Sequence, residues 1–114
     1  MKDVSWIKEF PAAVTVTDRG GTILEMNDKA CKAFDKDGGI NLIGKNLLEC
    51  HPEPARTRVE EMLVNQRGNC YTIEKNGTKK LIFQSPWYER GSYMGLVELS
   101  MEIPFEMPHF VREG

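Results

Sequence analysis

The chain has 114 residues, of which 40% are hydrophobic and 28% are charged, and its net charge is −2. This length suits one domain with one core. A near-neutral charge argues against a nucleic-acid partner, which needs a clustered positive field. No apolar run approaches the length of a membrane span, and the first residues lack the apolar stretch of a signal peptide. We therefore expect a cytoplasmic protein that contacts neither nucleic acid nor membrane.

Residues 1–11 form an amphipathic N-terminal flank. Val4, Ile7 and Phe10 recur at every third position, with Trp6 beside them, and a proline follows. This spacing predicts a short turn or helix with one apolar face. We expect Trp6, Ile7 and Phe10 to pack against the sheet or against a second copy of the chain.

Two short strands and a helix come next. The β-branched run 13–18 and the run 22–26 flank Arg19-Gly20-Gly21, a combination that predicts a β-hairpin. Asn27 or Asp28 then supplies the N-cap of a helix that continues to Phe34.

The middle of the chain, residues 35–54, is the least regular stretch. We expect a helical turn from Asn46 to Cys50. The clearest helix follows it and ends at Gly68. Its apolar face holds the residues spaced at three and four positions, namely Ala55, Val59, Met62, Leu63 and Gln66.

The last third predicts a three-stranded antiparallel meander. Asn76-Gly77 is a strong signal for a type I′ turn, which would place Glu74 opposite Lys79. A second turn at residues 89–92 leads into a strand over 93–103, and two prolines then predict an extended tail over 104–114. Alternation divides the last strand into one face with Tyr93, Val97, Leu99, Met101 and Ile103, and another with Met94, Leu96, Glu98, Ser100 and Glu102.

The order of these elements over residues 12–103 resembles the PAS domain. The matching residues are the strand–turn–strand run 16–27 with its Asp-Arg-Gly-Gly turn and capping Asn, Leu-Ile-Gly-Lys at 42–45, and Tyr-Met-Gly-Leu-Val-Glu at 93–98. The run 41–52 is similar to a bacterial sensory-box branch with a Cys-His-Pro element. The resemblance implies an α+β fold, in which a five-stranded antiparallel sheet carries helices on one face.

The same resemblance implies a function without catalysis. A PAS module senses a small ligand or a partner in the pocket between sheet and helices, and signals through dimerisation. We therefore expect a homodimer, an unknown small molecule and a separate output protein of a transcriptional or kinase kind. Fold alone does not choose the ligand.

Pocket candidates are the residues that such a fold turns toward the space between sheet and helices. Gln84 and Glu98 stand out among them, because polar groups on apolar strands need a partner, which could be a ligand, water or each other. The full set is Leu47, Met62, Leu63, Tyr71, Ile73, Ile82, Gln84, Met94, Leu96 and Glu98.

Cofactor motifs are incomplete. Residues 52–58 resemble the start of the helix that holds the proximal histidine in oxygen-sensing PAS kinases, but Val59 follows and cannot ligate iron. His51 is the alternative haem ligand; otherwise Cys50-His51-Pro52 is a helix-end corner where the histidine bonds to backbone. Leu47 stands where light-sensing relatives have the flavin-reactive cysteine. Haem and flavin thus both lack a matching motif, and we expect no metal.

A zinc site would need widely separated ligands. The residues available for one are Cys31, Cys50, His51, Cys70 and His109. The odd number of cysteines, without a Cys-x-x-Cys pair, instead indicates a reduced interior.

Overall fold

The computed structural model describes residues 5–114. Val4, which the sequence places on the apolar face of the N-terminal flank, lies outside the described residues. Ten elements follow in chain order: α1 (Ser5–Lys8), β1 (Ala13–Thr17), β2 (Ile23–Met26), α2 (Asp28–Ala33), the 3-10 helices η1 (Asp35–Asp37) and η2 (Gly39–Leu42), α3 (Ala55–Asn65), β3 (Asn69–Lys75), β4 (Thr78–Glu89) and β5 (Ser92–Ile103).

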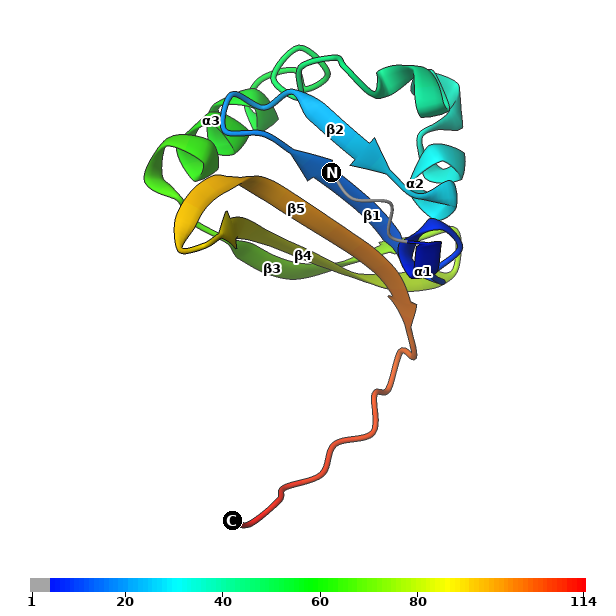
Figure 1. Cartoon of the computed structure of the whole chain (residues 1–114). Helices are drawn as coiled ribbons and strands as arrows, with labels where there is room; N and C mark the ends of the chain where they lie inside the picture. Colours follow the sequence, from blue (N-terminus) through cyan, green and yellow to red (C-terminus); the bar gives the residue numbers. More distant parts are fainter. Residues whose placement is uncertain (1–4) are drawn as a thin grey trace.

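The five strands form one antiparallel sheet in the order β2-β1-β5-β4-β3. The segment from α2 to α3 arches over one side of this sheet (Figure 1). The predicted α+β architecture, with helices on one face, is confirmed. The last strand of the chain, β5, lies at the centre of the sheet, and β2 and β3 are its edges.

Asn27 fixes the start of α2. Its side-chain oxygen accepts hydrogen bonds from the backbone N–H groups of Ala30 (3.1 Å) and Val14 (2.9 Å), so it caps α2 and binds β1 at once. Its amide nitrogen donates to the carbonyl oxygens of Ala12 (2.8 Å) and Ile7 (3.0 Å). Of the two residues that the sequence offered as the cap, Asn27 is therefore the one that caps the helix.

The segment after η2 runs beside the first hairpin. Ile23 donates its N–H to the Lys45 carbonyl (2.8 Å), and Leu47 donates to Gly21 (2.7 Å). Residues Asn46–Cys50 form the expected turn, in which Glu49 donates its N–H to the Asn46 carbonyl (3.1 Å) and Cys50 donates to Leu47 (3.2 Å). The Leu47 N–H has no partner within such a turn and pairs with the hairpin instead.

Helix α3 begins after Glu53, whose carboxylate accepts from the backbone N–H of Thr57 at 2.9 Å. It ends at Gln66, which adopts a left-handed conformation (φ 54°), so the predicted stop at Gly68 is two residues late. Gly68 has a different role. A Cβ atom there would lie 2.6 Å from the Gln84 carbonyl oxygen, so the glycine permits the close approach to β4.

Two tight turns connect the meander. Asn76 (φ 53°) and Gly77 (φ 76°) form the predicted type I′ turn. Glu74 lies opposite Lys79 as expected. Residues 90–91 make a second turn with positive φ angles before β5 begins.

A bulge in β5 reverses the predicted alternation at its start. Tyr93 lies opposite Tyr88, but Gly95 lies opposite Trp87, so Met94 is the extra residue. On the N-terminal side of the bulge, Tyr93 faces the helical layer, where its hydroxyl donates to the Leu63 carbonyl of α3 at 2.9 Å. The prediction that Tyr93 shares a face with Val97 is therefore wrong. An extra residue moves every preceding side chain to the opposite face.

Residues 104–114 contain no helix or strand and extend away from the domain (Figure 1). Lys79 donates to the Phe105 carbonyl at 3.5 Å, at the base of this tail. The tail and α1 leave the sheet at the same end, because Ala13 at the start of β1 lies opposite Ser100 near the end of β5. Within residues 5–114, none of the helices has the length and apolar character needed to cross a bilayer.

Candidate functional site

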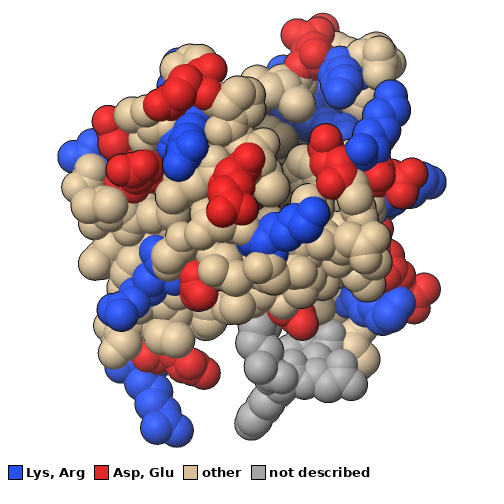
Figure 2. All heavy atoms as spheres, turned by 90° about the horizontal axis from the view of Figure 1, so that it is seen from above, with Lys and Arg blue, Asp and Glu red and all other residues tan. Residues whose placement is uncertain are grey.

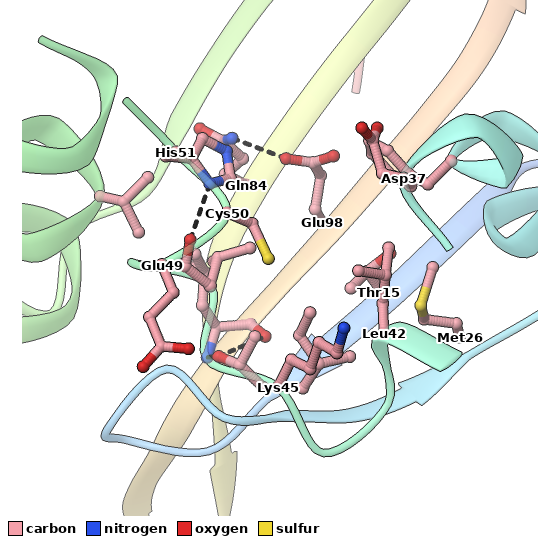
Figure 3. A pocket seen from close by; sticks show the side chains of 16 residues that line it. Thr15, Met26, Asp37, Leu42, Lys45, Glu49, Cys50, His51, Gln84 and Glu98 are labelled. Carbon is pink, nitrogen blue, oxygen red and sulfur yellow. Dashed lines mark hydrogen bonds between the residues drawn. The ribbon is translucent and has the colours of Figure 1, made fainter. Parts of the chain in front are cut away.

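A cavity of about 440 Å³ lies between the sheet and the helical layer (Figure 3). Its volume is within the range of small-molecule sites. The sheet contributes Thr15, Thr17, Ile23, Met26, Gln84, Leu96 and Glu98, and the helical side contributes Phe34, Asp37, Leu42, Lys45, Leu47, Glu49, Cys50, His51 and Val59.

A polar row crosses the sheet side of this cavity. Thr15 on β1, Glu98 on β5 and Gln84 on β4 lie opposite one another in register, so their side chains share one face. The Gln84 amide nitrogen donates to the Glu98 carboxylate at 2.8 Å (Figure 3). Gln84 is buried, with 8% of its surface exposed. The row therefore places a half-buried carboxylate at the centre of an otherwise mostly apolar surface.

The helical wall is positioned by the backbone pairing with the first hairpin described above. That pairing holds Lys45 and Leu47 at the cavity, and Asn46 between them is fixed by donation of its side-chain amide to the Gly20 carbonyl (2.9 Å). Val59 of α3 packs with Leu63 and Leu96 in a buried cluster at the far side.

Five of the predicted site residues line the cavity: Leu47, Gln84, Leu96, Glu98 and His51. The structure brings these together from residues 47–51, β4 and β5. Gln84 and Glu98 bind each other, which was one of the alternatives that the sequence left open.

Six other pocket candidates do not line the cavity. Leu63 and Ile82 are buried in the core instead, and Met62 packs against the cluster around Leu63. Tyr71 and Ile73 lie on the edge strand β3 and are exposed (42% and 38%). Met94 is the bulged residue of β5. The two β3 residues lie outside the cavity because its sheet side is made by β2, β1, β5 and β4.

Sequence reasoning missed most of the helical wall. Asp37, Lys45 and Glu49 come from the irregular stretch 35–54, which has no period that could orient them. Thr15 and Thr17 had a usable signal, because alternation in β1 puts them on one face and Val14 and Val16 on the other.

His51 has a defined orientation. Its Nδ1 atom lies 2.8 Å from the Leu47 carbonyl oxygen, which can only accept, so Nδ1 donates and the lone pair of the neutral ring is on Nε2. The predicted backbone contact of this corner is confirmed. Cys50, expected to pack as a small hydrophobe, is instead exposed at the cavity rim.

The cavity fits haem poorly. An Nε2 lone pair with Nδ1 donating to a carbonyl is the arrangement of a histidine ligand. Haem, however, carries two propionate carboxylates, and the lining offers the acids Asp37, Glu49 and Glu98 against one cation, Lys45. Repulsion between these carboxylates and the two propionates opposes the insertion of haem.

The cysteines are separate in space and in environment. Within residues 5–114 they form no disulfide, and no three His, Cys, Asp or Glu side chains converge as a metal site would require. Burial raises the pKa of the half-buried Cys31 thiol, and the charge of Asp28 raises it further. On the face drawn in Figure 2, acidic and basic side chains of the described residues are interspersed.

No family model matches the chain, and no curated protein matches it either. Solved structures do. The PAS domain of Bordetella pertussis BvgS has 18% identity and a TM-score of 0.62, covering 86% of this chain and 81% of that one. A sensory box sensor histidine kinase from Vibrio cholerae has 17% identity and a TM-score of 0.61, covering 87% of both chains. The Aer2 receptor from Vibrio cholerae, described as a dual PAS-heme oxygen sensor, has 16% identity and a TM-score of 0.59, covering 82% and 95%. These likenesses show a shared fold.

Proposed function

We propose that this chain, which has the fold of PAS domains, is a non-catalytic sensory module that binds a small ligand in the cavity between sheet and helices. The observation that carries this proposal is the cavity itself. It combines apolar walls with a few convergent polar groups, which is the usual composition of a small-molecule site. The names of the similar structures, sensors and sensor kinases, agree with a signalling role.

A role without catalysis is supported by the arrangement around His51. A nucleophilic Cys–His pair requires the histidine to accept a proton from the thiol while a third group orients it. Here Nδ1 donates to the Leu47 carbonyl, so only Nε2 could accept the proton. Cys50, however, is exposed at the cavity rim, and among the described residues its thiol has no hydrogen bond to the ring.

The signal would pass through a homodimer. Apolar side chains on both flanks are exposed, with Trp6 at 65%, Phe105 at 53% and Phe110 at 75%. Trp6 and Phe10 stack edge to face, 5.7 Å between ring centres, which gives α1 a rigid aromatic surface. Because both flanks leave the sheet at one end, a second copy could cover them together. The output belongs to a separate partner of a kinase or transcriptional kind.

Native mass spectrometry of the freshly purified protein tests both parts of this proposal at once. We expect a dimer that carries a bound small molecule and loses it on gentle activation. Its matched variant is Thr15→Phe, which fills the cavity from β1, with Thr72→Phe on the exposed edge strand as the control. Retention of the same ligand by Thr15→Phe, or a monomer without ligand, would contradict the proposal.

An absorption spectrum separates this function from haem sensing. Because the lining acids oppose the haem propionates, we expect no Soret band when haem is added to the protein. A band that disappears in His51→Ala would make the chain a haem protein and would overturn the small-ligand proposal.

A further inference from the structure

We propose that the ligand of this cavity is a small organic cation, a protonated amine on an apolar body, with its ammonium group bound by Glu98. This inference rests on the proposed function and names the chemical class of its ligand. Thr15, Glu98 and Gln84 form one row across three neighbouring strands, so their positions are fixed by backbone pairing rather than by flexible loops.

Within the described part of the chain, Glu98 has a hydrogen-bond donor but no cationic partner. Gln84 Nε2 donates to one carboxylate oxygen at 2.8 Å. Among residues 5–114 the only salt bridge joins Lys8 and Asp28, on the surface. Removing a carboxylate from water is costly unless an opposite charge accompanies it. A ligand ammonium would supply that charge. Its hydrogen bond to the Glu98 carboxylate would be stronger in the partly desolvated cavity than in water.

The other charged side chains that line the cavity also favour a positively charged ligand. Asp37 and Glu49 add two further acids to the lining, against the single cation Lys45. Lys45 lies across the cavity from Glu98 in the view of Figure 3, and its ammonium is not within salt-bridge distance of any carboxylate of residues 5–114. A cation therefore enters a net negative cavity, whereas a carboxylate ligand would meet repulsion from three acids.

The apolar part of the lining defines the rest of the ligand. Met26, Leu42 and Leu96 surround the polar row with hydrocarbon surface, and the volume of about 440 Å³ accommodates a body of several carbons. Such a body gains affinity by leaving water, while the ammonium sets its orientation. A bare metal ion or ammonium would not use this surface.

Isothermal titration calorimetry with three probes of equal length tests the inference on the unaltered protein. The probes are hexylamine, hexanoate and hexanol, which share the hydrocarbon and differ only at the head group. We expect hexylamine to bind at least about tenfold more tightly than either of the others. Equal or tighter binding of hexanoate or hexanol would overturn the inference, as would no binding of any probe.

Two variants test whether the ammonium group of the ligand binds at Glu98. Glu98→Gln keeps the shape and the hydrogen-bonding capacity toward Gln84, and we expect it to weaken hexylamine by at least about tenfold while leaving hexanol unchanged. Glu60→Gln, on the exposed face of α3, is the matched control and should bind hexylamine like the unaltered protein. Unchanged hexylamine binding in Glu98→Gln would overturn the assignment.

Failure of this inference is distinguishable from failure of the proposed function. If native mass spectrometry found a bound neutral or anionic molecule, the proposed organic cation would be wrong, but the proposed sensory function would not be contradicted. A protein that retains no molecule and binds no probe contradicts both. The comparison of the three probes does not depend on any variant folding correctly.

Discussion

At the scale of single residues, Asn27 connects three segments through one side chain. It caps α2, accepts from the Val14 N–H of β1 and donates to the carbonyl oxygens of Ala12 and Ile7, while only 5% of its surface is exposed. Replacing it leaves several buried backbone groups without partners at once. A cap that appears in the sequence as a local helix signal thus also anchors the N-terminal flank.

We expect Asn27→Ala to lower the free energy of unfolding by about 2–4 kcal/mol. The lost cap contributes about 0.5–2 kcal/mol, and the buried groups left unpaired contribute about 1–3 kcal/mol. Urea denaturation followed by circular dichroism measures the change. Asn41→Ala, at an exposed position of η2, is the control. A loss below about 0.5 kcal/mol, the usual size for surface changes, would mean that Asn27 does not anchor the flank.

The three thiols should differ in reactivity. The pKa of Cys31 is raised, first because burial disfavours its thiolate and second because Asp28 is nearby. Cys50 and Cys70 are exposed. At pH 8 we therefore expect iodoacetamide to label Cys50 and Cys70 well before Cys31, because the thiolate is the nucleophile.

The raised pKa of Cys31 also sets how stability and the labelling of this thiol depend on pH. A thiol whose pKa is raised by folding contributes full stability below its unfolded pKa and loses it as the pH rises through the folded value. Labelling of Cys31 should therefore catch up only at alkaline pH. Peptide mass spectrometry of a time course at two pH values measures this, and equal rates for all three thiols at pH 8 would contradict it.

At the scale of elements, β1 and β5 approach each other unusually closely at Gly95. Its φ is 151°, and a Cβ atom built there would collide with the Thr17 carbonyl oxygen. The same oxygen accepts a hydrogen bond from Trp87 Nε1 at 2.8 Å, and Trp87 lies opposite Gly95. The absence of a side chain at Gly95 thus allows β4 to contact β1 across β5.

We expect Gly95→Ala to destabilise the domain by more than about 3 kcal/mol, because strain and a backbone clash act together. Gly91→Ala is the control. It also has a positive φ (80°), but no atom lies within 4 Å of the added Cβ, so its cost should remain about 1–2 kcal/mol. Thermal unfolding of both variants measures the difference. Equal losses would show that the close approach is not what constrains Gly95.

The elements predicted correctly are those with local signals. The cap at Asn27, the Asn76-Gly77 turn and the apolar face of α3 each depend on neighbouring residues alone. The error at Tyr93 depends on distant residues, because the bulge that reverses this side chain is set by pairing with β4.

At the scale of the whole molecule, the sequence could predict the sheet side of the cavity better than its helical side. Strand alternation and the meander register place Gln84, Leu96 and Glu98 on one face. No period orients the stretch 35–54, so the positions of Asp37 and Lys45 become visible only after the chain has folded back on β2. The candidates on β3 lie outside the cavity for a related reason, since alternation gives a face of the sheet but not which part of that face lines the cavity.

The tail over 104–114 should be separable from the domain. Its side chains are exposed, with Val111 at 83%, and within residues 5–114 only the Lys79 side chain bonds to its base. We expect deletion of 104–114 to change the free energy of unfolding by less than about 0.5 kcal/mol, as for surface changes, and to shift the dimer toward monomer. Sedimentation velocity and urea denaturation measure the two effects.

The control is the double substitution of Phe110 and Val111 by serine in the full chain, which should weaken the dimer in the same direction. A dimer of unchanged strength in both variants would exclude the tail from the proposed interface.

The central position of β5 gives the cavity a direct mechanical connection to the end of the domain. Glu98 and Ile103 lie on the same strand, separated by about 17 Å at the ordinary rise of a strand, and the tail begins at the next residue. β4 pairs with this segment along its whole length, and β1 pairs with it as far as Ser100. The shortest covalent path from the cavity carboxylate to the tail is therefore five residues of sheet-paired backbone, and it passes through no helix.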